Sequence, residues 1–148
     1  MGLKTLLLVP LLTVLGALFF PLPEGGLADG HHPGRSMPGS PYNISQDDSG
    51  LQQVVLDAAY RYNNQSNDAF LFRASAIHRA QRQIVKGVRY IVDFDISRTV
   101  CRKRDNSNLS NCDFQPVGRL HQTFQCHIEL WTIPWLNETV TQVFLCKP

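Results

Sequence analysis

The sequence lacks the features that would indicate a metal site, an active site or a nucleic-acid-binding surface. No two cysteines have the Cys-x-x-Cys spacing of a zinc knuckle. The 14 Lys and Arg residues are mixed with 12 Asp and Glu residues, so no dense basic stripe is available to bind nucleic acid. His78, His121 and His127 have no evident nucleophile partner. We therefore expect no enzymatic activity, no metal or other cofactor, and no nucleic-acid partner.

The first 28 residues have the pattern of a secretory signal peptide. Lys4 precedes an almost continuous apolar run over residues 5–20, and small residues suited to cleavage follow at 25–28. A signal anchor is the alternative, but Pro10, Pro21 and Pro23 interrupt the run and no basic stop-transfer cluster follows it. We expect residues 1–28 to be a signal peptide, residues 29–40 a flexible tail, and residues 41–148 the folded domain of a secreted protein without a membrane partner.

All four cysteines lie late in the chain, at Cys101, Cys112, Cys126 and Cys146. Because their number is even and the route is secretory, two disulfides are favoured. The sequence leaves three pairings open, of which the sequential one closes two modest loops, each worth roughly 2–4 kcal/mol. Four sequons for N-linked glycosylation agree with secretion. They begin at Asn43, Asn64, Asn108 and Asn137.

One amphipathic helix is predicted near the start of the folded domain. Asp47, Asp48 and Ser49 offer capping side chains. Apolar residues then recur at helical spacing, namely Leu51, Val54, Val55, Ala58, Ala59 and Tyr62. The pattern predicts a helix of about 13 residues, which Asn63, Asn64 and the polar run to Asp68 end.

From residue 69 onward, the apolar residues follow the period of two that is typical of half-buried strands. One strand begins with Phe70 and Phe72 and runs toward Gln83. The next alternations comprise Val88, Tyr90, Val92, Phe94 and Ile96, then Leu120, Phe124, Cys126, Ile128 and Leu130, then residues 140–146. Short loops between strands imply an antiparallel meander. The predicted fold class is α+β, with one long α-helix packed across an antiparallel β-sheet of about five strands.

The segment Gln83-Ile84-Val85-Lys86-Gly87 is a short apolar loop that ends in Gly, and Pro134-Trp135 lies on a second loop. The two segments resemble the Gln-x-Val-x-Gly loop and the second hairpin of the type 2 cystatins, secreted inhibitors of papain-like cysteine proteases. Three further segments look most like the leukocyte-type branch of the family, cystatin F. They are Phe70-Leu71-Phe72, Arg98-Thr99 and Cys112-Asp113-Phe114-Gln115.

The four cysteines also match those of the family in order and approximate spacing. The resemblance therefore implies the disulfides Cys101–Cys112 and Cys126–Cys146. The leukocyte-type branch carries further cysteines through which it dimerises, and the mature part of this chain has none. We accordingly expect a monomer.

The resemblance implies a steric mechanism in which three segments fill the active-site cleft of a protease. The loop 83–87 and the Pro134-Trp135 loop would occupy the leaving-group side of the cleft, with Trp135 as the anchor. Gly39 lies eleven residues before the helix-opening Gly50, as in the family. It would allow a turn that keeps the chain away from the catalytic cysteine, while Pro38 occupies the S2 pocket. The implied targets are papain-like enzymes, the cathepsins among them, outside the cell or in endolysosomes.

A second protease and a second class of function stay open. Several type 2 cystatins inhibit legumain through an Asn in the loop after the helix, and Asn67 of Ser66-Asn67-Asp68 is the matching residue. The alternative is an ordinary turn, in which Asn and Asp are favoured, and a glycan on Asn64 would block the site. A cystatin-fold secreted glycoprotein or host-defence precursor without inhibitory activity is the other class, against which the intact loops argue.

Overall fold

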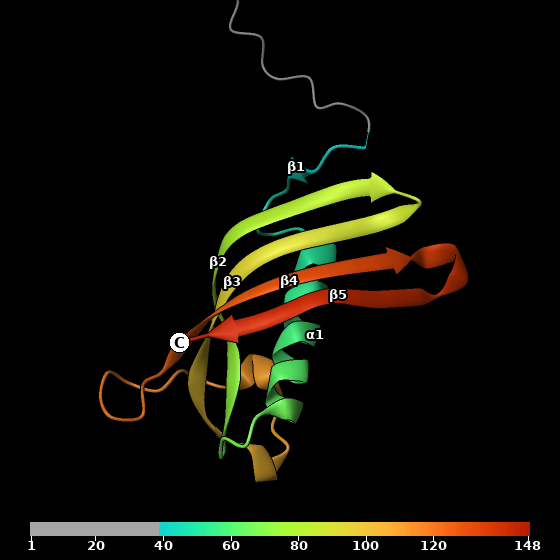
Figure 1. The fold of residues 1–148 in the computed structure, drawn as a ribbon. Helices are drawn as coiled ribbons and strands as arrows, with labels where there is room; N and C mark the ends of the chain where they lie inside the picture. The colour runs from blue at the N-terminus through green and yellow to red at the C-terminus, as the bar shows by residue number, and fades with distance from the viewer. Residues whose placement is uncertain (1–38) are drawn as a thin grey trace, which may run out of the picture. The chain divides into compact units, whose positions relative to one another are not determined.

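The computed structural model describes residues 39–148, and their ribbon is shown in Figure 1. The α-helix and the strands are β1 (Tyr42–Asn43), α1 (Ser49–Gln65), β2 (Phe70–Val85), β3 (Gly87–Arg102), β4 (Thr123–Ile133) and β5 (Glu138–Lys147). Three single-turn 3-10 helices complete the list: η1 (Lys103–Asp105), η2 (Leu109–Asn111) and η3 (Pro134–Leu136). The strands form one antiparallel sheet in the order β1-β2-β3-β4-β5. The predicted α+β fold is confirmed, and the expected signal peptide lies outside the described residues.

Asp48 caps the N-terminus of α1, because its carboxylate accepts a hydrogen bond of 2.9 Å from the backbone N–H of Leu51. The helix ends at Gln65, within the polar run that was predicted to end it, but α1 spans 17 residues rather than about 13 and includes both Asn63 and Asn64. The side chain of Asn63 is only 3% exposed, and it bonds the N–H and the carbonyl of Phe72, each at 2.8 Å. Since this amide is satisfied by a strand, it does not compete with the backbone of its own helix.

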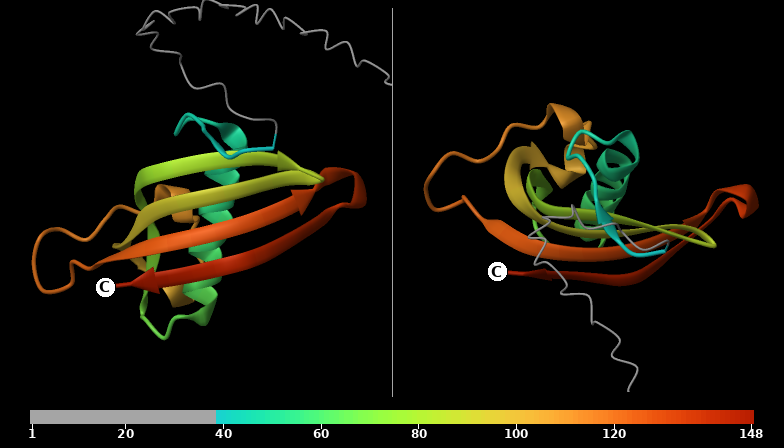
Figure 2. Two further views of the ribbon diagram at one scale, coloured as in Figure 1. Left: turned by 45° about the horizontal axis from the view of Figure 1, so that its top comes forward. Right: turned by 90° about the horizontal axis from the view of Figure 1, so that it is seen from above.

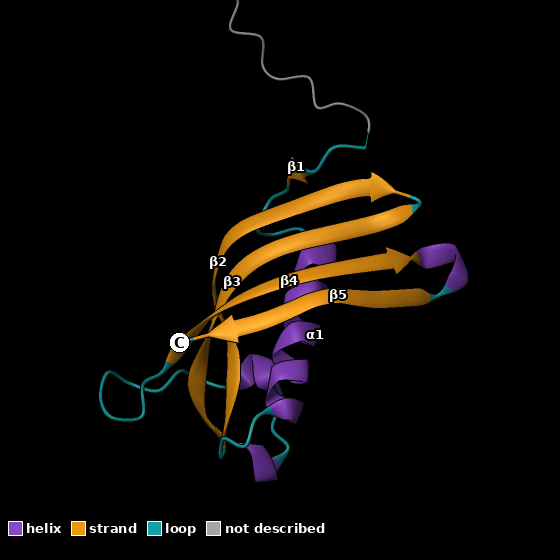
Figure 3. Ribbon diagram, viewed as in Figure 1, coloured by secondary structure: helices purple, strands orange, loops and turns teal. Residues whose placement is uncertain are grey.

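The helix packs against one face of the sheet, and the strands curve partway around it (Figures 2 and 3). The alternation predicted for β3 is confirmed, because Tyr90, Val92, Phe94 and Ile96 are buried. The rest of the buried core consists of Leu51, Val54, Val55, Ala58, Phe72, Ala80, Cys126 and Ile128. The residues of β3 between the buried ones are half-buried, and they face away from α1.

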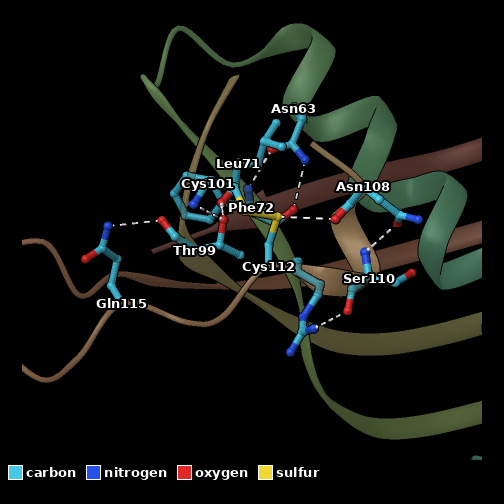
Figure 4. Close-up of a disulfide and its surroundings, with 10 residues drawn as sticks. Asn63, Leu71, Phe72, Thr99, Cys101, Asn108, Ser110, Cys112 and Gln115 are labelled. Atoms are coloured by element: carbon cyan, nitrogen blue, oxygen red, sulfur yellow. Dashed lines mark hydrogen bonds between the residues drawn. A yellow bond between two sulfur atoms is a disulfide. The ribbon is translucent and has the colours of Figure 1, made fainter. Parts of the chain in front are cut away.

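A smaller cluster lies where β2 begins (Figure 4). Leu71 and Phe72 are both buried, whereas the alternation had predicted Phe70 and Phe72 on the buried face. The ladder between β2 and β3 is irregular here, and the fully buried Leu109 of η2 packs in the cluster that contains Leu71. The disulfide between Cys101 and Cys112 ties this segment to β3. A loop packed from outside the sheet thus overrides a simple period of two.

The strand that was expected to begin at Leu120 begins three residues later, at Thr123. Leu120 is exposed in the preceding loop, since no element covers it. In the ladder between β4 and β5, Cys126 lies directly opposite Cys146, and the two form the second disulfide. Within residues 39–148, no helix is long and apolar enough to cross a membrane.

Candidate functional site

Two turns lie side by side at one end of the sheet. The first joins β2 to β3 at Lys86, and the second joins β4 to β5 through η3. Because β3 pairs with β4, with Val88 opposite Thr132, the two turns must be neighbours. Figures 1 and 2 show them together, beyond the ends of the strands. Register alone therefore brings the loop 83–87 and the Pro134-Trp135 loop together.

The turn between β2 and β3 is as short as an antiparallel pair allows. Val85 pairs with Gly87, which leaves Lys86 alone at the tip. Gly87 has a φ of +100°, and a Cβ there would lie 2.4 Å from the carbonyl oxygen of Thr132. The indole N–H of Trp131 donates a 2.9 Å hydrogen bond to the carbonyl of Lys86. Only glycine fits at position 87, and β4 fixes the position of the tip.

The turn between β4 and β5 is a single 3-10 turn. Pro134 stands at its start, where a fixed φ favours the turn and a missing N–H costs nothing. Asn137 closes it in the left-handed region with a φ of 51°, a conformation that Asn tolerates. Between them, Trp135 and Leu136 project from the turn, and Trp135 is 63% exposed. The chain thus holds a large aromatic ring in solvent on a constrained turn.

The two turns carry an unusual amount of exposed apolar surface. Ile84 and Val85 are 54% and 38% exposed on the first turn. Trp135, Leu136 and Val140 are exposed on or beside the second. Clustered apolar surface that is open to solvent marks a site of interaction with another molecule. The arrangement provides a binding surface rather than a reaction centre.

Gly39 is attached to the first turn by a hydrogen bond. The side-chain amide of Gln83 donates to the carbonyl of Gly39 at 2.6 Å, and Arg89 donates to the amide oxygen of Gln83 at 3.3 Å. Gly39 has a φ of +87°, and nothing would contact a Cβ placed there. Tyr42 of β1 pairs with Arg82 and continues the attachment along β2. Three segments therefore meet at one edge of the molecule: the loop 83–87, the Pro134-Trp135 loop and Gly39. We call this surface the edge. Pro38 itself lies outside the described residues.

Asn67 is not part of this edge. It lies in the turn between α1 and β2, at the opposite end of β2 from Val85, and its side chain is exposed. The hydroxyl of Ser66 accepts a 3.0 Å hydrogen bond from the N–H of Asp68, and Arg98 pairs with the carboxylate of Asp68. These contacts hold the turn in one conformation.

The four sequon asparagines are all exposed. Asn64 lies in the last turn of α1, and Asn137 lies beside the exposed turn of the edge. Asn43 lies in β1, and Asn108 caps η2.

Within residues 39–148, no three His, Cys, Asp or Glu side chains are placed to hold a metal ion. All four cysteines are in disulfides.

Three residues of the edge were missed by the sequence analysis. Leu136 extends the exposed apolar surface, and its position directly after Pro134-Trp135 was the signal for it. Trp131 and Arg89 hold the tip and Gln83 in place. Arg89 lies opposite Gln83 in the hairpin, so a correct register of β2 and β3 would have identified it.

Comparisons with known proteins agree with this geometry. A family model described as the cystatin domain matches residues 39–135. Human cystatin-F is 41% identical over 112 residues, which cover 76% of this chain and 77% of that protein. Cystatin-C of Macaca mulatta is 34% identical over 137 residues, which cover 93% and 92%. The crystal structure of dimeric human cystatin F superimposes with a TM-score of 0.67 at 39% identity, covering 80% of this chain and 94% of that chain.

Proposed function

Because the chain belongs to the cystatin family, as a type 2 cystatin near cystatin F, we propose that it inhibits papain-like cysteine proteases by occupying their active-site cleft. Members of the family are protease inhibitors and not enzymes, and membership implies inhibition of cysteine proteases. The proposal goes further in three respects. Binding is reversible and competitive, the targets include cathepsins, and the edge described above is the contact surface.

The observation that carries this proposal is the convergence of three segments on one edge. The exposed Trp135 lies on a constrained turn, and hydrogen bonds attach Lys86 to Trp131 and Gln83 to Gly39. Burying apolar surface contributes about 25 cal/mol per Å², and a large aromatic anchor dominates such contacts. Because the sheet holds the loops in place before binding, little conformational entropy is lost on association.

The N-terminal segment contributes specificity rather than a cleavable bond. The positive φ of Gly39 turns the chain where it reaches the edge, and the carbonyl of Gly39 is already held by Gln83. A chain turned in this way passes beside the catalytic cysteine of the protease without presenting its peptide bond. We assign Pro38 to the S2 pocket and Gly39 to the turn.

The decisive experiment titrates the purified secreted protein into papain and a panel of cathepsins while following peptide-substrate hydrolysis. We expect reversible inhibition that rising substrate concentration relieves. Absence of inhibition of every enzyme would favour the alternative, a cystatin-fold secreted glycoprotein or host-defence precursor without inhibitory activity. The exposed Trp135 is the observation that argues against that alternative, since a protein without a partner would gain from burying it.

We also propose that Asn67 inhibits legumain, at the opposite end of the molecule. The support is an exposed Asn on a turn that Ser66, Asp68 and Arg98 hold in one conformation. Asn67→Ala should abolish inhibition of legumain and leave inhibition of papain unchanged. Asn64→Gln, which removes the neighbouring sequon, serves as the control for steric blocking by a glycan. If neither the wild type nor Asn64→Gln inhibits legumain, the assignment of Asn67 fails.

The setting of this activity is part of the proposal. Homologous cystatins are secreted, and we propose that residues 1–28 direct secretion, residues 29–40 form a tail and residues 41–148 form the inhibitor domain. Asn43, Asn64, Asn108 and Asn137 are exposed candidates for N-linked glycans. We further propose a monomer that acts outside the cell or in endolysosomes. Intact mass before and after enzymatic deglycosylation tests the removal of residues 1–28 and the glycans, and sedimentation velocity tests the monomer.

A further inference from the structure

A continuous chain of hydrogen-bonded side chains runs along the outer face of the sheet and ends at Gly39. It comprises Asp93, His127, Glu129, Arg89 and Gln83. His127 bonds Asp93 through Nδ1 at 2.5 Å and approaches Glu129 through Nε2 at 3.4 Å. Glu129 pairs with Arg89, Arg89 donates to Gln83 at 3.3 Å, and Gln83 donates to the carbonyl of Gly39 at 2.6 Å.

Strand register places these side chains on one face. His127 lies opposite Asp93, and Gln83 lies opposite Arg89. Glu129 lies opposite Ile91, between those two pairs. The intervening residues of β3 are buried against α1, so the chain is confined to the face that the helix does not cover.

His127 lies between two carboxylates, and this decides its charge. Its hydrogen bond to Asp93 and then that to Glu129 raise its pKa above the ordinary value. The hydrogen bond from Arg89 lowers the pKa of Glu129, which therefore stays ionised. Other ionisable residues near this site come from the adjoining strands: His78 and Arg79 on β2, Asp95 on β3, and Lys147 on β5. His78 pairs with Asp95 and Arg79 lies 3.9 Å from Asp93, so neither contacts Glu129.

The protonation state of His127 sets the bonds that Glu129 can make. Imidazolium donates from both nitrogens, so it hydrogen-bonds to Asp93 and to Glu129 at the same time. Neutral imidazole that donates to Asp93 turns a lone pair toward the carboxylate of Glu129, which is repulsive. Glu129 then shifts, and the Arg89 guanidinium that it holds shifts with it. Arg89 in turn fixes the amide oxygen of Gln83, which leaves the amide N–H directed at Gly39.

We propose that Arg89 is a positioning residue for the protease-binding edge, which orients Gln83 so that it holds Gly39, and that protonation of His127 strengthens this positioning. The N-terminal segment is docked on the first hairpin below the pKa of His127 and loosens as the pH rises through it. The effect on inhibition rests on the proposed function, whereas the effect on Gly39 does not.

The direct test follows the backbone amide of Ser40, which shares a peptide group with the carbonyl of Gly39. In NMR spectra of the secreted protein between about pH 5 and pH 8.5, this amide should titrate with the same midpoint as the imidazole of His127. In Arg89→Met and in His127→Gln the titration should be absent. Arg61→Met is the matched control, since Arg61 is exposed on α1, which covers the opposite face of the sheet, and it should leave the titration intact. A Ser40 amide that does not titrate, or that titrates unchanged in Arg89→Met, overturns the proposal.

The functional test compares inhibition constants for papain at matched pH. The inhibition constant of Arg89→Met is divided by that of the wild type at the same pH, so papain's own pH dependence cancels. We expect a ratio of about five in acid, at the low end for coupled sites, falling to about one above the pKa of His127. In a protein truncated before Ser40 the ratio should be about one at every pH. A ratio of about one at every pH overturns the positioning role of Arg89, and a ratio above one that does not change with pH overturns the role of His127. A normal Ser40 titration without any inhibition overturns only the proposed function.

Discussion

At the scale of single residues, the two tryptophans differ in what surrounds them. Trp131 lies within β4, is half-buried, and donates its indole N–H to the backbone of Lys86. Trp135 follows Pro134 in a turn with no neighbouring strand to cover it, so its ring remains in solvent. One ring therefore supports the scaffold, and the other is available to a partner.

Trp135→Ala should weaken inhibition of papain by about 2 kcal/mol or more, roughly 30-fold, because an anchoring aromatic carries a large share of such binding. Its exposure means that stability should hardly change. The matched control is Leu145→Ala, since Leu145 is also exposed, at 56%, but lies on β5 near the end of the strand that is far from the turn. Inhibition constants from substrate hydrolysis decide the matter, with circular dichroism as the check of folding. An unchanged constant removes Trp135 from the contact surface.

The two left-handed glycines at the edge should respond differently to substitution. Gly87→Ala places a Cβ 2.4 Å from the backbone of Thr132, which cannot give way without disturbing β4. The strain and the clash together should cost about 2 kcal/mol or more in unfolding free energy. Gly39→Ala meets no atom, so it should cost less stability while disturbing the N-terminal segment. Urea unfolding measures both, and equal losses would contradict this account.

At the scale of elements, the start of α1 is tied to the sheet through one carboxylate. Asp48 accepts the N–H of Leu51 and also pairs with Arg82 of β2 at 2.7 Å. The hydrogen bond from Leu51, followed by that from Arg82, lowers the pKa of Asp48 below its ordinary value of 3.8. The cap therefore fixes both where the helix begins and how its first turn meets the sheet.

Asp48→Ala should destabilise the protein by about 1 kcal/mol or more, because it removes both the cap and the partner of Arg82. Asp48→Asn should cost less, since Asn is a good N-cap and only the charge is lost. The difference between wild type and Asp48→Asn should narrow as the pH falls through the lowered pKa of Asp48. Unfolding free energies at neutral and acid pH provide the measurement. A larger loss for Asp48→Asn than for Asp48→Ala would show that the cap is not the cause.

At the scale of the whole molecule, the ion pairs define a pH of maximum stability. The charged forms of Asp48 and Glu129, whose pKa values are lowered, stabilise the fold, and this is lost as the pH falls through those values. The pKa of His127 is raised above 6.5, so its contribution is complete in acid and is lost as the pH rises through the folded value. Stability should therefore peak at mildly acidic pH.

Urea unfolding at a series of pH values tests this profile. In His127→Gln the decline on the alkaline side should flatten, while the decline in acid should remain. His121→Gln is the control, because His121 is exposed in the loop before β4 and lies outside the outer-face chain. An alkaline decline of equal size in wild type and His127→Gln would contradict the role given to His127.

The sequence by itself determined the fold class and the residues of the two turns. Helical spacing from Leu51 and alternation from Val88 identify the buried faces, because periodicity reports which side chains share a face. Pro134, Gly87 and Asn137 specify tight turns through their own backbone preferences. These are local properties, so a single chain reveals them without knowledge of its neighbours.

Only the tertiary structure decided what depends on how separate elements pack together. The backbone of Phe72 keeps Asn63 inside the helix, and the cluster around Leu109 buries Leu71 against the expected alternation. Register across three strands places Gln83 beside Gly39 and connects both to His127 through Arg89. Such contacts join residues of different elements, between six and 44 positions apart in the sequence, and their energies depend on packing that no local pattern encodes.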